Sequence, residues 1–158
     1  MKAGQGVPQA LHWRCVRFAD LGVDNLYDLL ALRGQVFIVE QGPYLDPDGI
    51  DRQAAHLFGR DAQGVLRAGL RIVDPGIKYA EPSIGRVAVD ASLRGTGVGH
   101  ALVTEGLRRS DALWPGQGLR ISAQAHLERF YAAHGFTAVG EVYLEDGIPH
   151  REMVRPAQ

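Results

Sequence analysis

Apolar residues alternate with polar ones, or cluster between turn residues, in seven short stretches of the chain. Both patterns are typical of β-strands. The predicted strands cover residues 12–18, 56–60, 65–73, 84–89, 119–123, 136–144 and 148–154. The last two are joined at Asp146-Gly147, a dipeptide that favours a tight hairpin turn.

Three further stretches have apolar residues at helical spacing. The first begins near Asp24 or Asn25, either of which can cap a helix, and extends to Glu40. The others cover residues 100–111 and 125–134. The order is therefore β-α-β-β-β-α-β-α-β-β, which predicts a mixed α/β fold in a single domain.

The chain of 158 residues has an ordinary globular composition, with 46% apolar and 22% charged residues. Its formal net charge is −1, and no basic run is interleaved with aromatic residues. Nucleic acid and anionic membranes are therefore not expected as partners. The six histidines form no H-E-x-x-H pattern and the chain has no C-x-x-C pair, so no metal site is expected.

Cys15 is the only cysteine, which rules out a disulfide within one chain and fits a reducing compartment. The first nine residues are polar and glycine-rich and lack the apolar stretch of a signal peptide. The sequence also lacks a run of about 18 apolar residues, the length that a membrane helix needs. We therefore expect a cytoplasmic protein with a flexible N-terminus at residues 1–10 and one folded domain at residues 11–156.

The stretch from Arg94 to Gly99 reads R-G-T-G-V-G and lies between a predicted strand and a predicted helix. The first N–H groups of a helix lack partners within it, and the helix dipole favours an anion there. Glycine lets the backbone approach a ligand closely, and Arg94 adds a cation. The loop thus predicts a diphosphate site, with a tight structural turn as the alternative. It matches neither a P-loop nor the G-x-G-x-x-G fingerprint of dinucleotide binding.

Two motifs together resemble those of the GNAT superfamily of N-acetyltransferases. The segment 93–102 matches the pattern R-x-x-G-x-G followed by a helix, and Phe130-Tyr131-x-x-x-Gly135-Phe136 resembles the second family motif. The resemblance extends over residues 12–155. The segments 36–41, 46–49, 124–127 and 145–150 resemble, more narrowly, the ElaA-like branch of that superfamily.

The resemblance implies a single-domain GNAT fold that binds acetyl-CoA as its co-substrate. The pyrophosphate would lie on the backbone amides of Arg94, Gly95, Thr96, Gly97, Val98 and Gly99. The backbone of Val87 and Val89 would pair with the pantetheine arm like an added strand, where the fourth and fifth strands splay apart. A backbone N–H near Val89 would polarise the thioester carbonyl. Gln124 stands where many family members have an asparagine that binds the pantetheine arm.

Tyr131 stands where family members have a tyrosine beside the CoA sulfur. The resemblance therefore implies that its hydroxyl protonates the departing thiolate. The alternative is that Phe130 and Tyr131 are only the aromatic core of a short helix. A buried phenol needs a polar partner, which favours the catalytic role for Tyr131.

The base that many family members use, a glutamate on the fourth strand, is missing here, because residues 84–89 contain no acid. The other candidates are Glu40, His56, His126 and His150. Glu40 is preferred, because it ends the first predicted helix and the segment after that helix borders the acceptor site in this fold. The alternative is that Glu40 is a solvated acid at a helix end.

Six acids fall in two segments that would flank the acceptor site. They are Glu40, Asp46, Asp48, Asp51, Glu145 and Asp146. Their clustering predicts an attraction for a cationic acceptor, such as a polyamine, an amino sugar or lysine. The alternative is that they are ordinary turn residues, since aspartate is common in loops.

These features predict an acetyl-CoA-dependent N-acyltransferase that moves the acetyl group to a primary amine by direct attack in a ternary complex. The amine would belong to a small molecule or to a peptide. Cys15, in a predicted strand, is not expected to be a nucleophile. The alternative is a non-catalytic acyl-CoA-binding sensor or interaction module on the same fold, which the missing acid of the fourth strand favours. Because family members are often dimers, a homodimer is also an expectation.

Overall fold

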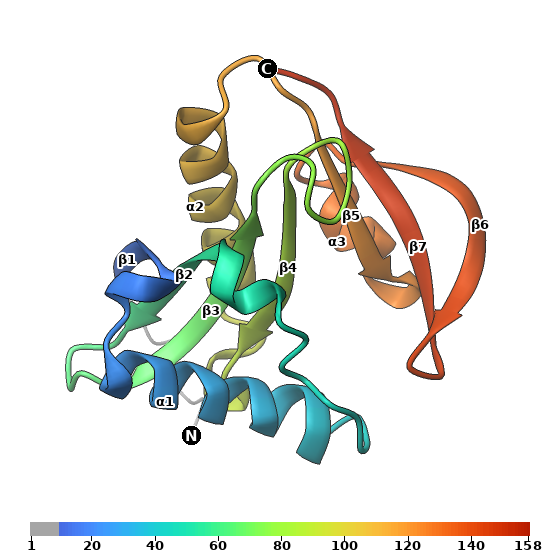
Figure 1. The fold of residues 1–158 in the computed structure, drawn as a ribbon. Helices are drawn as coiled ribbons and strands as arrows, with labels where there is room; N and C mark the ends of the chain where they lie inside the picture. The colour runs from blue at the N-terminus through green and yellow to red at the C-terminus, as the bar shows by residue number, and fades with distance from the viewer. Residues whose placement is uncertain (1–9) are drawn as a thin grey trace, which may run out of the picture.

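The computed structural model describes residues 10–158, and the strands in this range form two antiparallel sheets (Figure 1). The larger sheet has the order β1-β2-β3-β4, with bounds His12–Arg17, Ala54–Arg60, Leu66–Val73 and Ser83–Val89. The smaller sheet has the order β5-β7-β6, with bounds Leu119–Gln124, Ile148–Arg155 and Thr137–Glu145. The N-terminus that was expected to be flexible, residues 1–10, lies outside the described residues except for Ala10.

The α-helices of the described range are α1 (Val23–Arg33), α2 (Val98–Leu113) and α3 (Glu128–Ala132). A π-helix, η2 (Gly34–Val39), continues α1 directly. The short 3₁₀-helices are η1 (Phe18–Asp20), η3 (Ile50–Gln53), η4 (Ala91–Leu93) and η5 (Ala125–Leu127). Strands and α-helices follow one another in the predicted order, and the predicted mixed α/β fold is confirmed.

The start of α1 differs from the prediction. Its N-cap residue is Gly22, at a φ of 77°, rather than Asp24 or Asn25. Asn25 lies inside the helix, where its Nδ2 donates a hydrogen bond of 2.8 Å to the carbonyl of Leu21. A positive φ at the cap position favours glycine, which explains why a polar cap is not used there.

α1 and α2 cover opposite faces of the larger sheet. Leu102 of α2 belongs to one core cluster together with Leu57 and Leu70. Leu29 of α1 belongs to a second cluster, together with Phe58. Because Leu57 and Phe58 are consecutive in β2, their side chains point to opposite faces of the sheet. The two clusters therefore hold one helix on each side.

The two sheets meet where β4 lies beside β5 (Figure 1). A backbone hydrogen bond of 3.1 Å from the N–H of Arg120 to the carbonyl of Pro82 joins the strands where they begin. Farther along, Val87 of β4 and Leu127, just after β5, line the walls of one cavity. The strands thus diverge toward their C-terminal ends.

β4 contains a bulge beside this opening. Its register with β3 shifts between Gly69 and Arg71, so that Arg86 and Val87 oppose a single residue of β3. Arg86 takes a φ of 50°, which is unusual for a residue other than glycine. Bulges redirect side chains next to functional sites, and here Val87 lines the cavity.

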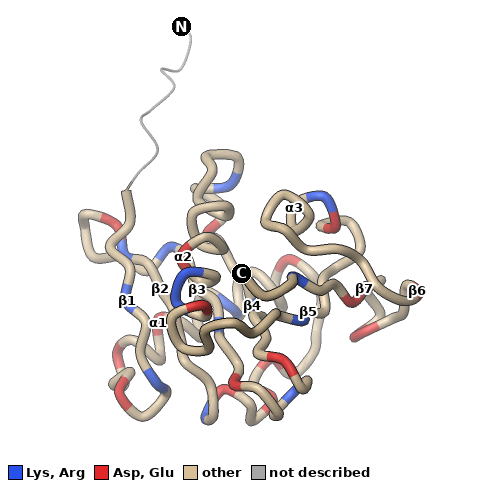
Figure 2. The backbone as a smooth tube through the Cα atoms, turned by 90° about the horizontal axis from the view of Figure 1, so that it is seen from above, with Lys and Arg blue, Asp and Glu red and all other residues tan. Residues whose placement is uncertain are grey.

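Acidic and basic residues are interspersed over the fold (Figure 2), in keeping with the net charge of −1. Within residues 10–158, no helix is long and apolar enough to cross a membrane.

Candidate active site

The glycine-rich loop reverses the chain between η4 and α2. Gly95 and Gly97 have φ values of 76° and 88°, in the left-handed region. A Cβ at either position would meet nothing within 4 Å, so the backbone conformation, rather than space, requires glycine there. The hydroxyl of Thr96 donates to the carbonyl of Leu93 inside the loop. The loop thereby sets where α2 begins.

The start of α2 presents unpaired backbone donors. The N–H of Ala101 donates to the carbonyl of Gly97 at 3.1 Å, the first bond of the helical pattern. The N–H groups of Val98, Gly99 and His100 precede that bond and have no helical acceptor. Together with the helix dipole, these donors form a site for an anion.

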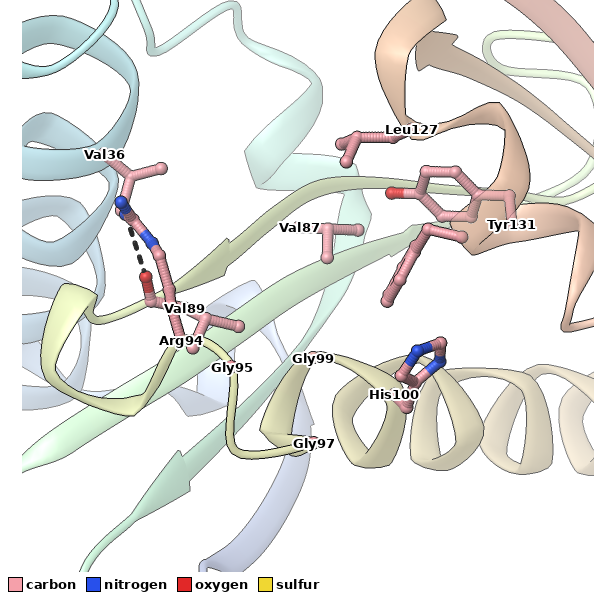
Figure 3. A pocket seen from close by; sticks show the side chains of 11 residues that line it. Val36, Val87, Val89, Arg94, Gly95, Gly97, Gly99, His100, Leu127 and Tyr131 are labelled. Atoms are coloured by element: carbon pink, nitrogen blue, oxygen red, sulfur yellow. Dashed lines mark hydrogen bonds between the residues drawn. The ribbon is translucent and has the colours of Figure 1, made fainter. Parts of the chain in front are cut away.

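A cavity of about 430 Å³ extends from this helix start into the opening between β4 and β5 (Figure 3). Of the predicted site residues, it is lined by Val87, Val89, Arg94, Gly95, Gly97, Gly99 and Tyr131. Its other lining residues are Val36, His100, Leu127 and Phe130. Sequence reasoning did not select these four. Val36 and Leu127 lie far from the glycine loop in the chain, whereas His100 and Phe130 are the direct neighbours of the predicted Gly99 and Tyr131.

Not every predicted residue lines this cavity. Thr96 and Val98 line a neighbouring cavity, together with Trp13 of β1. Gln124 lies at a third cavity, where its Nε2 donates to Oε1 of Gln41 at 3.1 Å. The structure therefore places the predicted loop residues around two adjoining hollows and Gln124 at another.

Arg94 links the glycine loop to the end of η2. Its Nη1 lies 2.7 Å from Oε2 of Glu40, and its Nη2 donates to Oε1 of the same carboxylate at 3.0 Å. Nη2 also donates to the carbonyl of Val89 at 3.2 Å, the bond drawn in Figure 3. Both oxygens of Glu40, the predicted base, are thus engaged by Arg94, the predicted phosphate ligand.

Tyr131 is 7% exposed, and its hydroxyl points into the cavity (Figure 3). The rings of Phe130 and Phe136 pack edge-on against it, with centroids 5.0 Å and 6.0 Å away. Burial raises the pKa of Tyr131 well above its usual range, because desolvation disfavours the phenolate. The side chain is therefore a neutral hydroxyl that can donate a proton into the cavity.

Two histidines meet at the rim of the same cavity. Nδ1 of His100 lies 2.9 Å from Nε2 of His134, although the residues belong to different elements. The ring of His100 also packs on Phe130, with centroids 4.5 Å apart. Burial, and then the charges of His100 and Arg155, lower the pKa of His134.

The cavity that contains Gln124 has a volume of about 180 Å³. Two parts of the chain contribute residues to the walls of both this cavity and the larger one. On η2, Val36 lines the larger cavity and the next residue, Phe37, lines the smaller one. At the junction of β5 and η5, Leu127 of η5 lines the larger cavity, whereas Gln124, the last residue of β5, lines the smaller one. The two cavities therefore lie on either side of η2 and of the β5–η5 segment.

The four candidates for the base are placed differently. Glu40 is paired with Arg94. His56 is 1% exposed and its Nε2 lies 2.8 Å from the carbonyl of Asp51, while burial lowers its pKa. His126 is exposed on η5. His150 lines the smaller cavity.

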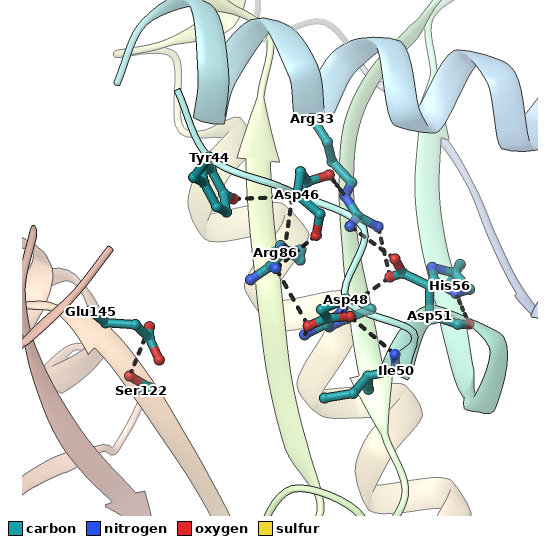
Figure 4. Close-up of polar contacts among 11 residues, drawn as sticks. Arg33, Tyr44, Asp46, Asp48, Ile50, Asp51, His56, Arg86, Ser122 and Glu145 are labelled. Atoms are coloured by element: carbon teal, nitrogen blue, oxygen red, sulfur yellow. Dashed lines mark hydrogen bonds and ion pairs between the residues drawn. The ribbon is translucent and has the colours of Figure 1, made fainter. Parts of the chain in front are cut away.

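The predicted attraction of three loop acids for a cationic acceptor is wrong, because arginines of the same chain pair with them (Figure 4). Asp46 lies 2.8 Å from Nε of Arg33 and 2.9 Å from Nε of Arg86. Asp51 pairs with Arg33 at 2.8 Å and with Arg71 at 3.1 Å. These contacts fasten the loop between η2 and β2 to α1 through Arg33 and to the sheet through Arg71 and Arg86.

The third acid of this loop, Asp48, accepts hydrogen bonds of 2.7 Å from both Nη atoms of Arg71. Its pKa is lowered to about 2, since the bonds and charge of Arg71, with help from Arg86, outweigh its desolvation. Glu145 and Asp146, in the second acidic segment, belong instead to the lining of the smaller cavity. Within residues 10–158, no group of three or more His, Cys, Asp or Glu side chains could hold a metal ion.

Comparison with known proteins places this site in a family. A family model described as an acetyltransferase (GNAT) domain matches residues 50–156. A UPF0039 protein of Synechocystis is 45% identical over 145 residues, which cover 91% of this chain and 94% of that protein. The protein ElaA of Escherichia coli is 40% identical over 148 residues, which cover 92% and 96%.

Solved structures agree with these matches. The crystal structure of an acyl-CoA N-acyltransferase from Pseudomonas aeruginosa superposes with a TM-score of 0.87 at 44% identity, covering 92% of this chain and 99% of that one. The crystal structure of Escherichia coli ElaA superposes with a TM-score of 0.86 at 40% identity, with the same coverage. The chain therefore belongs to the GNAT acetyltransferase family, in the branch that contains ElaA.

Proposed function

We propose that this protein is an acetyl-CoA-dependent N-acyltransferase that moves an acetyl group to a primary amine by direct attack in a ternary complex. One observation carries the proposal. A single cavity connects the unpaired donors at the start of α2 with the hydroxyl of Tyr131, between two diverging strands. That arrangement suits a ligand with a phosphate at one end and a reacting group at the other.

The residues at the helix start fit a pyrophosphate. Gly95 and Gly97 have no Cβ to shield the backbone, and the first N–H groups of α2 are free to donate. At Gly99, a Cβ would lie 3.5 Å from the ring of Phe130 and 3.9 Å from Val89, which would narrow the cavity. The guanidinium of Arg94 adds two donors at the same rim, where a phosphate would compete with Glu40.

The walls of the cavity fit the pantetheine arm. Val87 and Val89 bring the edge of β4 to it, and the bulge at Arg86 leaves backbone groups beside β5 outside a regular ladder. Pantetheine carries two amides, which can pair with such groups as an added strand does. Gln124 lies at the smaller cavity. We therefore assign its side chain to the region between bound acetyl-CoA and the acceptor amine.

Acetyl-CoA, when bound, supplies the thioester whose acyl carbon the amine attacks. Tyr131 then gives its proton to the departing sulfur, a role supported by its burial and by the direction of its hydroxyl. Glu40 stays a predicted base, although its ion pair with Arg94 also suits a role in positioning that arginine. The acceptor is a small-molecule or peptide amine.

A second candidate function, a sensor that binds acyl-CoA without catalysis, is favoured by one observation. β4 reads Ser-Ile-Gly-Arg-Val-Ala-Val and carries no acid to serve as the family's usual base.

Two measurements separate these functions. We expect acetyl-CoA to raise the melting temperature, because a ligand at a hundredfold excess over its Kd stabilises the fold by about 2.7 kcal/mol. The shift should weaken in Arg94→Ala but not in Arg108→Ala, an arginine on the exposed side of α2. Without a shift in the wild type, both functions are refuted. Thiol release from acetyl-CoA across a panel of primary amines then identifies an enzyme, and a shift without thiol release identifies a sensor.

A further inference from the structure

His150 has a hydrogen bond that sets which of its ring nitrogens carries a proton. The residue is 8% exposed, and its Nδ1 lies 2.7 Å from the carbonyl oxygen of Ile148. A carbonyl oxygen only accepts hydrogen bonds, so Nδ1 is the donor. In the neutral ring, the lone pair is then on Nε2, which lies on the opposite side of the imidazole.

The lone pair of His150 faces a second acceptor. Its Nε2 lies 3.3 Å from Oε2 of Glu145, at the lining of the smaller cavity. When the neutral imidazole carries its proton on Nδ1, its Nε2 has no hydrogen to donate. A carboxylate oxygen has none either, so these two atoms cannot hydrogen-bond to each other. This contact is favourable only when a proton, or a group that donates several hydrogens, lies between the two atoms.

A primary ammonium group is such a donor, because it has three N–H bonds and a positive charge. We propose that Glu145 and His150 bind the ammonium group of the acceptor, and that Nε2 of His150 takes its proton. This assignment rests on the proposed function and names the substrate class and the proton acceptor for the same site. It also uses the smaller cavity, whose walls include residues of η2 and of the β5–η5 junction, as do the walls of the larger one.

The reaction that follows is balanced in protons. The ammonium gives one proton to Nε2 of His150, and the imidazolium is stabilised by the Glu145 carboxylate. The free lone pair of the amine forms a bond to the thioester carbon, and the carbon–sulfur bond breaks. The sulfur takes the proton of Tyr131, and the nitrogen of the new amide returns one to the Tyr131 oxygen. The imidazolium finally releases its proton to water.

His150 suits this role better than Glu40 does. Both oxygens of Glu40 lie within 3.0 Å of Arg94 nitrogens, so its lone pairs are already engaged by a cation. Nε2 of His150 has only an acceptor as its neighbour. Glu145 lies partly in solvent, with 42% of its side chain exposed, and can therefore admit a ligand.

Other polar groups surround the pair on each element packed against it. From β6, the ring of Tyr143 stacks on His150 with centroids 6.2 Å apart, and its hydroxyl bonds to Ser122 of β5. Asp146 and Tyr44 line the same cavity from the hairpin turn and from the loop after η2. Lys78, before β4, is a cation whose charge acts on Glu145.

The first test observes the tautomer and the ammonium site directly, without turnover. In ¹⁵N spectra of the imidazoles, with His150→Gln for assignment, neutral His150 should carry its proton on Nδ1. Propylammonium chloride should perturb the Nε2 signal saturably, and more weakly in Glu145→Gln. Tetramethylammonium chloride, which has the charge but no N–H, should not. A proton on Nε2, or equal effects of the two salts, would overturn the proposal.

The second test is the pH dependence of acetyl transfer to the best amine of the panel. General base catalysis contributes about 10²–10⁴-fold, so kcat/KM of His150→Gln should fall by at least about a hundredfold at neutral pH. The deficit should shrink as the pH approaches the pKa of the amine itself, about 10, where no base is needed. His12→Gln, on the far edge strand β1, should match the wild type.

A deficit of His150→Gln that is the same at every pH would indicate a structural role and refute the proposal, as would a wild-type profile. The melting shift with acetyl-CoA shows whether the variant is folded and binds the donor. If His150→Gln is not folded, Glu145→Gln is used in its place. Its deficit in kcat/KM should depend on pH in the same way but be smaller. If the wild type binds no acetyl-CoA, the proposed function is refuted. The ¹⁵N measurement then still decides whether the ammonium site exists.

Discussion

Asp48 offers a quantitative test of the loop that the arginines hold in place. Its carboxylate accepts two hydrogen bonds of 2.7 Å from Arg71, lies 3.4 Å from Arg86, and accepts a third bond of 3.1 Å from the backbone N–H of Ile50. Asp48→Asn keeps the shape of the side chain and removes its charge. If the ion pairs hold the loop, the variant should be less stable than the wild type at neutral pH.

The magnitude follows from the pKa of Asp48, which falls from 3.8 to about 2 in the folded protein. At about 1.36 kcal/mol for each pKa unit, the shift corresponds to at most about 2.4 kcal/mol. Because Asp48 is exposed and solvent screens its charge, we expect the ionised carboxyl to contribute about 1 kcal/mol. Because the folded pKa is the lower one, this stability is fully present well above pH 3.8 and is lost as the pH falls through 2. About half of it, roughly 0.5 kcal/mol, should be gone at pH 3.

Urea unfolding at pH values from 7 to 3 measures this contribution in the wild type, in Asp48→Asn and in Asp20→Asn. Asp20 is exposed on η1 and serves as the matched control. The free energy of unfolding of the wild type should exceed that of Asp48→Asn by an amount that shrinks by about 0.5 kcal/mol between pH 6 and pH 3. A difference that does not change with pH would show that the Asp48 charge is not coupled to folding, and the reasoning would fail.

Three further outcomes are expected. Tyr131→Phe should lower kcat for acetyl transfer at least tenfold and leave the affinity for acetyl-CoA unchanged. The control Tyr27→Phe, at an exposed position, should keep wild-type turnover. Near wild-type turnover in Tyr131→Phe would exclude Tyr131 as the acid. Gly97→Ala must hold alanine at a φ of 88°, at a cost of about 1–2 kcal/mol. Calorimetry should therefore find either that acetyl-CoA binds about 5–30-fold more weakly or that the fold is destabilised by about 1–2 kcal/mol. A variant that is unchanged in both respects would contradict the need for glycine. Glu40→Gln removes a charge that competes for Arg94, so the Kd for acetyl-CoA should fall a few-fold at low salt. A weaker complex would mean that Glu40 positions Arg94, and a kcat deficit that vanishes at high pH would assign the base to Glu40.

The order of the strands and helices could be predicted because the relevant signals are local. Asp146-Gly147 joins β6 to β7 with both residues at positive φ, 51° and 75°, as that dipeptide favours. The glycine loop likewise stands directly between the strand and the helix that it connects. Each of these features depends on residues close together in the chain, and periodicity and turn chemistry are sufficient to find them.

The role of the loop acids could not be predicted, because their partners are distant. Arg33 ends α1 and Arg71 lies in β3, 18 and 20 positions away from the Asp51 that pairs with both. A sequence pattern does not show that the helix and the strand bring two cations to one loop. The bulge at Arg86 was missed for a similar reason, since it exists only relative to the register of β3.

The π-helix η2 explains how one short segment can contact both cavities. A π-helix is wider than an α-helix and is frequent at functional sites. Here it begins at Gly34, where α1 ends, and sends the adjacent side chains Val36 and Phe37 to different cavities. Its C-cap residue, Glu40, bonds to Arg94 of the glycine loop. A phosphate that draws Arg94 away from Glu40 would therefore act on the same segment that forms a wall of the proposed amine site, and we expect the binding of donor and acceptor to be coupled through η2.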